Sequence, residues 1–198
     1  MLSPEERGRL LAIARQAIRG YVLQQALPGT PNAATQSVET SGVFVTLHVL
    51  GRLRGCIGRL DSREPVDALV ATCAVLAASR DPRFAQIGVN ELDPLDIEIS
   101  LLSPPEPVSA ANALDEIQPG LHGLIVMQGD ARGLLLPQVA TGWGAQRFLE
   151  ETCRKAELPR EAWRDSATRI ERFTAEVFSE SGERGAHPQK FTRFNAGL

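Results

Sequence analysis

The chain has 198 residues, of which 43% are hydrophobic and 23% are charged, and its formal net charge is −3. This composition is typical of a globular protein of about one domain that buries its own core, and it excludes disordered and fibrous chains. The positive charge is almost entirely arginine and is interleaved with acidic residues. The sequence therefore does not predict the basic face of a nucleic-acid-binding protein.

The N-terminal half predicts a helix, a loop, a hairpin and a second helix. The "SPEE" sequence at Ser3 is a capping box with proline at the first helical position, so a helix begins there. Residues 27–41 contain turn-forming residues without periodicity and predict a loop. The stretch "GVFVTLHVLGRLRGCIG" then predicts two strands around Gly51, and residues 64–80 predict a largely buried helix.

The C-terminal half predicts a second series of strands and helices. Residues 95–103 alternate between apolar and polar side chains and predict a strand that ends at two prolines. A short helix is expected over 110–117, and "HGLIVMQGDARGLLLP" predicts a hairpin that turns at Gly129. An amphipathic helix over 141–158 and a strand over 169–178 follow.

This order of elements predicts an α+β fold with a mixed or antiparallel β-sheet flanked by helices. We expect one domain over residues 1–180 and a polar C-terminal tail over 181–198. The longest nearly apolar run, residues 68–78, is too short to span a membrane, and the N-terminus lacks the layout of a secretory signal. Three widely separated cysteines also fit a reducing compartment, so we expect a cytoplasmic protein without membrane contact.

The stretch "LRGCIGRL" contains the main candidate site. It places Cys56 between Gly55 and Gly58, with Arg54 two residues before the cysteine and on the same face of a strand, roughly 6.6 Å away. A nearby arginine favours the nucleophilic thiolate, and the glycines allow a ligand or an oxyanion to approach backbone N–H groups. The alternative is a glycine-flanked packing site, because free cysteine is among the most frequently buried residue types.

The alternation of side chains also predicts the register of the hairpin. Pairing the apolar faces of the two strands requires a three-residue connection over 50–52. Cys56 then lies opposite Thr46, and Arg54 lies opposite His48. We therefore expect Arg54, Cys56 and His48 to share one face of the sheet.

The remaining candidates each have a catalytic or binding interpretation and a structural one. His122 could be the base of a thiolate enzyme or a turn histidine that opens a strand. Arg80 and Arg83 could bind an anion in a cleft or cap the preceding helix, and Trp143 could be a ligand platform or a helix-entry staple. The cysteines and histidines lack metal-ligand spacing and no nucleotide-binding loop occurs, so we expect no metal and no cofactor.

The sequence resembles the AMMECR-type domain family, also named AmmeMemoRadiSam system protein A. "LRGCIG" at Leu53 to Gly58 is the signature hexapeptide of this family. Further matching blocks follow in order over about residues 5–180, among them "DPRF", "LDIEISLLSPPEPV", "HGLIV" and "GLLLPQVA". The family often has lysine at the position of His48, so the resemblance gives no support for an essential role of that histidine.

The resemblance implies a compact α+β domain with a smaller lobe and an activity that is not established. It also implies association with a Memo-type protein and a radical S-adenosylmethionine enzyme. This chain is not itself the radical enzyme, because it lacks the CxxxCxxC spacing that holds the iron–sulfur cluster.

Two functions stay open. In the first, the chain is a partner or binding component whose "LRGCIG" face recognises a protein or a small ligand. In the second, it is a cysteine-dependent enzyme in which Cys56 is the nucleophile, Arg54 lowers its pKa, and N–H groups near Gly55 and Gly58 stabilise developing charge. We prefer the first, because the sequence does not place an acid–base companion beside the cysteine.

Overall fold

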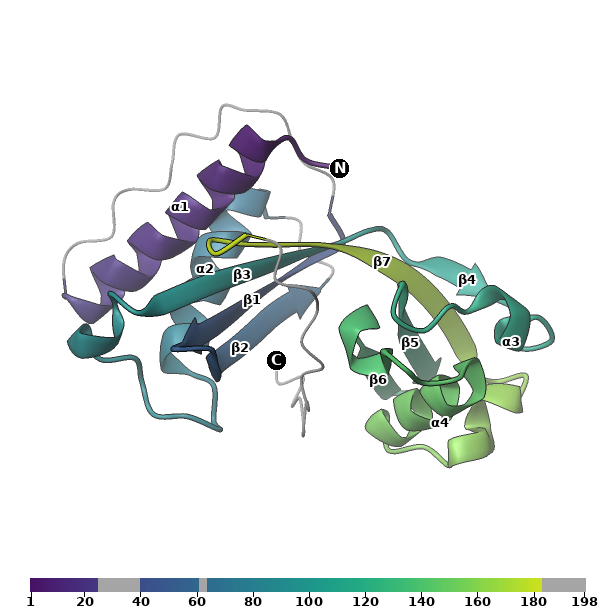
Figure 1. The fold of residues 1–198 in the computed structure, drawn as a ribbon. Helices are drawn as coiled ribbons and strands as arrows, with labels where there is room; N and C mark the ends of the chain where they lie inside the picture. The colour runs from purple at the N-terminus through teal and green to yellow at the C-terminus, as the bar shows by residue number, and fades with distance from the viewer. Residues whose placement is uncertain (25–39, 61–63, 183–198) are drawn as a thin grey trace. The chain divides into compact units, whose positions relative to one another are not determined.

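The structure is a computed structural model in which residues 1–24, 40–60 and 64–182 are described (Figure 1). Most of the loop expected over 27–41 lies outside the described residues. The tail expected over 181–198 lies outside them from residue 183 onward.

The chain divides into two compact units. The first contains the described residues of Met1–Ser103 and Glu176–Arg184, and the second contains those of Pro104–Ala175. Almost all of these residues fall within 1–180, the range predicted for the domain. Each unit has its own apolar core, so the two are described separately.

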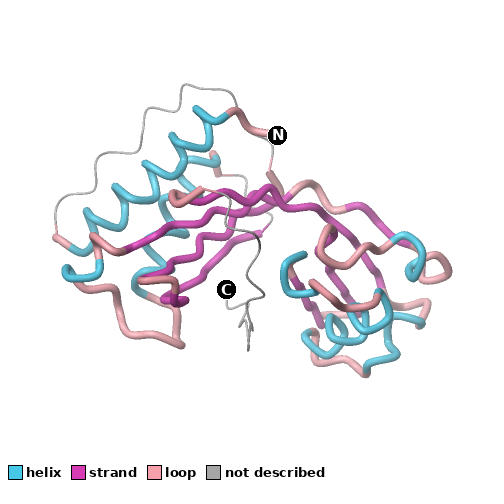
Figure 2. Tube along the Cα trace, viewed as in Figure 1, coloured by secondary structure: helices cyan, strands magenta, loops and turns pink. Residues whose placement is uncertain are grey.

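The first unit is a sheet with two helices on one face (Figures 1 and 2). The strand order is β2-β1-β3, and the end of β7 adds beside β3, where the Glu180 N–H donates to the Ile97 carbonyl at 3.1 Å. The elements are α1 (Pro4–Val22), β1 (Gly42–Val49), β2 (Arg52–Leu60), α2 (Val66–Ser79), the short helix η1 (Val89–Glu91), β3 (Leu95–Leu102) and the last residues of β7 (Arg169–Ser179).

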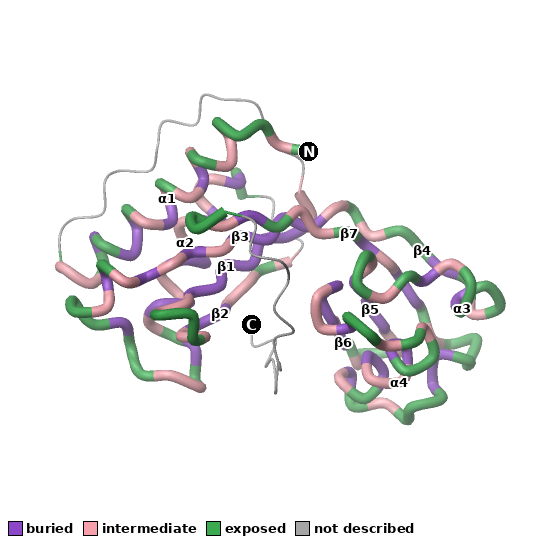
Figure 3. Tube along the Cα trace, in the orientation of Figure 1, coloured by how far each residue is buried: buried purple, intermediate pink, exposed green. Residues whose placement is uncertain are grey.

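The capping box and the alternating strand pattern explain how these elements form. Ser3 Oγ accepts from the Glu6 N–H at 3.2 Å and Glu6 Oε2 accepts from the Ser3 N–H at 2.7 Å, so α1 begins where the sequence predicts. β1 is buried from Gly42 to Leu47 (Figure 3), and Val43, Val45 and Leu47 of this segment pack against the helices. The core joins these side chains to both helices and to β3, with Leu10, Ile18, Val43, Val45, Leu47, Leu69, Val70, Ile97 and Ile99 at its centre.

The β1–β2 hairpin confirms one expected pair and corrects the other. Cys56 pairs with Thr46, as predicted, but His48 pairs with Leu53, so the expected pairing of Arg54 with His48 is wrong. The strands are joined by two residues, not three, and the register shifts between Leu47 and His48. Arg54 is the extra residue of this bulge, so a two-residue turn and a bulge give the same total offset as the predicted three-residue loop.

The second unit is another antiparallel sheet with its own helices (Figure 2). β5 pairs with β6 and with β7, and β4 pairs with β7. The elements are β4 (Glu106–Val108), α3 (Ala113–Glu116), β5 (His122–Gln128), β6 (Ala131–Leu135), η2 (Pro137–Ala140), α4 (Ala145–Lys155), η3 (Arg160–Arg164) and β7 up to Ala175. Phe148 and Leu149 of α4 are fully buried in the core of this unit.

Trp143 lies at the entry to α4. Its ring meets that of Phe148 edge-on, with 6.3 Å between the ring centroids, and Gly144 between them is the N-cap. This is the helix-entry staple considered for Trp143, because an apolar residue before the N-cap packs on the fourth helical residue.

The predicted α+β class is confirmed, and every ladder described between named strands is antiparallel. α4 begins at Ala145 rather than near residue 141, because Gly142 has a φ of +80° and interrupts the helical backbone. β4 lies just after the two prolines at which the strand over 95–103 was expected to end, and it contains Pro107. It pairs only with β7 among the described strands, in an edge position that tolerates proline. No helix in the described part of the chain has the length and apolar character to cross a bilayer.

Candidate functional site

Cys56 lies on the sheet face opposite the helices of the first unit, in the middle of β2. The Thr46 hydroxyl on β1 donates to Cys56 Sγ at 3.2 Å, and the cysteine is only 1% exposed. Because β1 pairs with both neighbouring strands at Thr46, the row continues from Cys56 through Thr46 to Glu98 on β3. A thiol, a hydroxyl and a carboxyl thus share one line across three strands.

The environment of the thiol disfavours its ionised form. Burial raises the pKa of Cys56 to about 11, although the Thr46 hydrogen bond and the positive charge of Arg83 act in the opposite direction. The cation that bears on this thiol is Arg83, whereas the sequence suggested Arg54. The neutral thiol is therefore the favoured form of Cys56 at neutral pH.

Arg54 connects the hairpin to the segment between α2 and η1. Its Nε and Nη2 donate to the two Glu91 carboxylate oxygens at 2.6 and 3.0 Å. Its Nη1 donates to the Ala85 carbonyl at 2.7 Å, and Nη2 also reaches the Gln86 carbonyl at 3.3 Å. The planar guanidinium suits this two-pronged contact, and Arg54 is the extra residue of the bulge in β2.

Gly55 and Gly58 are required by close packing. A Cβ on Gly55 would lie 2.2 Å from the Ala77 carbonyl oxygen of α2, and a Cβ on Gly58 would lie 2.2 Å from the Phe44 ring. Both distances are far below van der Waals contact, so the two glycines let the helix and the aromatic ring approach β2. The space predicted for a ligand at these glycines is filled by the protein itself.

Asp81 is a key residue of this region, and the sequence, which placed it with Arg80 and Arg83 after the buried helix, did not connect it with Cys56. Its carboxylate is almost fully buried and accepts from the Cys56 N–H at 2.8 Å. It also accepts from Arg83 Nε at 2.9 Å and Arg83 Nη2 at 2.6 Å. Burial alone would raise the pKa of Asp81, but the hydrogen bonds from Arg83 and from the Cys56 N–H hold it below its usual value. The "DP" sequence at the end of a predicted helix marked the turn and gave no sign of this contact.

Glu98 is the second residue that the sequence did not single out. Burial, and then the nearby Asp96 carboxylate, raise the pKa of Glu98 above its usual value. The signal was present in the alternation of "LDIEIS", which places this glutamate on the face opposite the apolar side chains. Its position beside Thr46 depends on the pairing of β1 with β3.

The two arginines proposed to bind an anion are used differently. Arg83 holds Asp81 and lies over the Phe84 ring, with 5.2 Å from its guanidinium carbon to the ring centroid. Arg80 is exposed at the end of α2, and its side chain forms no ion pair with any of the described residues. The Arg83 side chain thus pairs with the carboxylate that follows α2.

His122 belongs to the second unit and opens β5. Its Nδ1 accepts from the Gln118 backbone N–H at 3.0 Å. The backbone N–H of His122 donates to the Gln118 carbonyl at 2.8 Å. Burial, and then the positive charge of Arg172, lower the pKa of His122. These contacts match the turn histidine considered as the alternative to a catalytic base.

The described side chains offer little for a metal. No group of three or more His, Cys, Asp or Glu side chains within the described ranges is arranged to hold a metal ion. Cys56, Cys73 and Cys153 are free and buried.

Comparison with known proteins identifies the family. The family model described as AMMECR1 matches residues 11–178. A protein of Methanothermobacter thermautotrophicus is 45% identical over 91% of this chain and 97% of its own length. A protein of Thermofilum pendens is 38% identical over 96% of this chain and 97% of its own length. The crystal structure of the uncharacterized protein PH0010 from Pyrococcus horikoshii has a TM-score of 0.81 and 37% identity, and covers 93% of this chain and 96% of its own. The chain therefore belongs to the AMMECR1 family.

Proposed function

We propose that this AMMECR1-family chain is a binding component that acts with a Memo-type protein and a radical S-adenosylmethionine enzyme. The partners are those implied by the sequence resemblance, and the proposal places the complex in the cytoplasm, which suits three free cysteines. The observation that carries the proposal is the use of the "LRGCIG" residues: Arg54, Gly55, Cys56 and Gly58 all make internal contacts. A motif used in this way fixes the shape of a surface without supplying a reactive group.

The geometry explains how such a surface is held in place. Arg54 and Asp81 fasten the segment between α2 and η1 to the edge of β2 from two points. Fixing a segment before a partner arrives reduces the conformational entropy lost on binding. The motif would then act by ordering the neighbouring loop.

Co-purification tests this function. Full-length chain should retain the Memo-type protein or the radical enzyme encoded with it, and Arg54→Ala should weaken retention because it releases Glu91 and two loop carbonyls. Arg172→Ala is the matched control, since Arg172 makes a similar contact to Glu106 and Glu116 in the second unit. Retention of neither partner by the wild type would contradict the proposal.

The alternative, a cysteine-dependent enzyme, predicts a different property of the thiol. With a pKa of about 11 for Cys56 and about 12 for Cys73, we expect neither to be alkylated in the folded protein between pH 5 and 9. Iodoacetamide labelling followed by mass spectrometry checks this, with urea-unfolded protein as the positive control. Rapid labelling of Cys56 in the folded chain that slows in Arg83→Gln would support the enzyme instead.

A further inference from the structure

Three exposed apolar side chains of the first unit come from different segments that meet at residues 85–91. Tyr21 is at the end of α1, Leu50 is at the tip of the β1–β2 hairpin, and Val89 is in η1. Their exposed fractions are 36%, 83% and 58%. Figure 1 shows the ends of α1 and of the hairpin at the same end of this unit as η1.

Hydrogen bonds join these segments around Gln86. The Tyr21 hydroxyl donates to Gln86 Oε1 at 3.2 Å, and Arg54, from the strand that follows Leu50, donates to the Gln86 carbonyl at 3.3 Å. Arg54 also holds Glu91, two residues after Val89. The segments that carry the three apolar side chains are therefore tied together at this end of the unit. We call the residues Tyr21, Leu50, Gln86 and Val89 the Gln86 surface.

Leu50 has an unfavourable backbone conformation for its residue type. Its φ is +51° and that of Gly51 is +76°, as a two-residue hairpin turn of the type I′ class requires. Asn, Asp or Gly is preferred at such a position, because the left-handed region brings Cβ of other residues close to the backbone. A leucine here adds strain and, being exposed, contributes almost nothing to the core.

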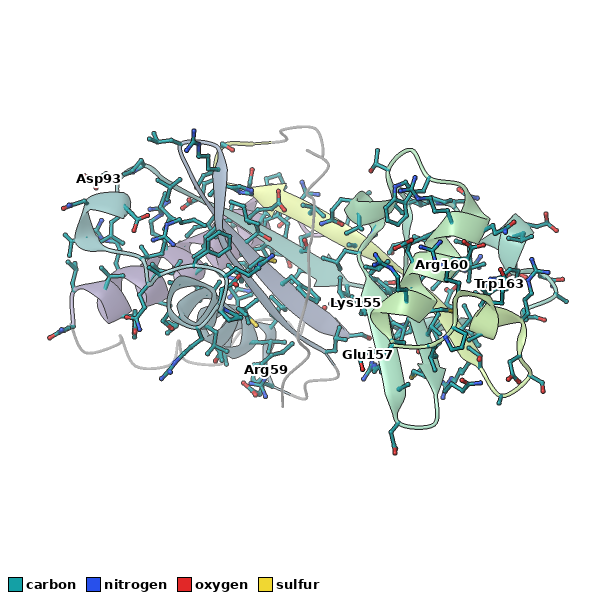
Figure 4. The ribbon with its side chains drawn as sticks, turned by 90° about the horizontal axis from the view of Figure 1, so that it is seen from below. Arg59, Asp93, Lys155, Glu157, Arg160 and Trp163 are labelled. Carbon is teal, nitrogen blue, oxygen red and sulfur yellow. The ribbon has the colours of Figure 1, made fainter. Side chains whose placement is uncertain are left out.

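The charges beside the Gln86 surface favour an acidic partner. Arg52 follows the hairpin tip and Arg80 ends α2, and both are exposed without an ion pair among the described residues. Of the acidic side chains at this end, Glu91 and Asp81 are paired with Arg54 and Arg83, and Asp96 accepts hydrogen bonds from Ser181. Asp93 is exposed (Figure 4). Arginine and tyrosine are among the residue types that contribute most to protein interfaces.

We propose that the Gln86 surface is the docking site for a protein segment that carries an apolar side chain flanked by carboxylates. The apolar side chain would pack on Leu50, Val89 and the Tyr21 ring, and the carboxylates would pair with Arg52 and Arg80. This inference rests on the proposed function, since it names the surface through which the chain binds its protein partner. A nucleic acid fits less well, because the chain is acidic overall with a net charge of −3.

Substitutions at Leu50 separate binding from folding. Leu50→Asn introduces a residue that tolerates positive φ and removes the apolar side chain, so it should raise the melting temperature while weakening partner binding by about tenfold. The double variant Arg52→Glu with Arg80→Glu should also weaken binding. The affinity of wild type should fall as the salt concentration rises, and the double variant should lose this salt dependence. Leu114→Asp, at a residue of the second unit that is 46% exposed, is the control and should bind as wild type does.

The measurement is the dissociation constant of the full chain for the purified Memo-type protein and for the purified radical enzyme, at low and high salt. If wild type binds one of them and Leu50→Asn and the double arginine variant bind equally well, the docking site is wrong and the proposed function stands. If wild type binds neither, both proposals are contradicted. Weaker binding of the Leu50 and arginine variants alone supports the Gln86 surface.

Discussion

The two units contain the same local arrangement, a β-hairpin followed by a helix. β1 and β2 precede α2 in the first unit, and β5 and β6 precede α4 in the second. In each, a glycine of the second strand lies against the helix backbone: a Cβ on Gly55 would be 2.2 Å from the Ala77 carbonyl oxygen, and one on Gly133 would be 2.5 Å from that of Thr152. A glycine inside the "LRGCIG" stretch and one outside it therefore meet the same packing requirement.

Aromatic rings extend this similarity. The Phe44 ring covers Gly58 in the first unit and the Phe173 ring covers Gly123 in the second, each across a strand pair. Covering a strand glycine with a cross-strand aromatic ring restores the packing that the missing side chain would have given.

The difference between the hairpins lies at their outer strands. The ladder between β5 and β6 is regular from Leu124 to Gln128, whereas β2 has one extra residue, Arg54. β2 also has its Cys56 N–H satisfied by Asp81. The bulge and the buried carboxylate distinguish the first hairpin, so we relate function to them rather than to the glycines.

The largest expected effect tests the shared arrangement. Gly55→Ala and Gly133→Ala should each destabilise the protein by about 3 kcal/mol or more, because the added methyl group meets rigid helix backbone. Urea unfolding checks this with two signals. Trp143 and Trp163 both lie in the second unit, so tryptophan fluorescence reports that unit, whereas circular dichroism reports both.

The same pair of variants shows whether the units unfold together. If the two units unfold in a single cooperative transition, each variant shifts its fluorescence midpoint and its circular dichroism midpoint by the same amount. If Gly55→Ala shifts only the dichroism signal, the units unfold separately. A shift of less than 1 kcal/mol for either variant would contradict the close approach of strand and helix.

A smaller effect tests the difference between the hairpins. Asp81→Asn weakens the bonds to Arg83 and to the Cys56 N–H, so we expect a loss of about 2 to 3 kcal/mol at pH 7. The pKa of Asp81 is below its ordinary value of about 3.9, so its stabilising effect is complete above that value and is lost as pH falls through the lowered pKa.

Denaturation of wild type and Asp81→Asn across pH 2 to 7 measures this effect. The gap between the two proteins should narrow in the acid range and close at the lowest pH. Asp165→Asn is a control, because Asp165 is an exposed carboxylate of the second unit that accepts from the Ala167 N–H at 2.9 Å. A gap of the same size at every pH would show that the Asp81 charge does not stabilise the strand edge.

The smallest effect has the opposite sign and gives a baseline for the glycine variants. Gly8 lies in the exposed interior of α1, and nothing is within 4 Å of the Cβ that an alanine would add. Gly8→Ala should therefore stabilise the protein by about 0.5 to 1 kcal/mol, because alanine loses less backbone entropy in a helix. Thermal unfolding measures this effect. Destabilisation by Gly8→Ala would show that replacing a glycine can lower the stability even where the added Cβ meets no neighbouring atom.

The sequence alone determined the elements whose signals are local. The capping box predicted the start of α1, and the turn residues predicted where along the chain both hairpins lie. Strict alternation predicted that Cys56 lies opposite Thr46. These predictions succeeded because hydrogen bonds and side-chain direction over a few residues depend on neighbours in the chain. The predicted three-residue loop was wrong, but it gave the correct number of residues between Thr46 and Cys56. Burying one face of both strands constrains that number.

Only the tertiary structure decided what the motif side chains contact. Arg54 binds Glu91, 37 residues later, and Asp81 accepts from the N–H of Cys56, 25 residues earlier. Which carboxylate meets which donor depends on the packing of α2 against β2 and on where the next segment turns. Local pattern carries no information about such long-range approach, so the same residues that suggested a reactive thiol instead bind a loop to the edge of a sheet.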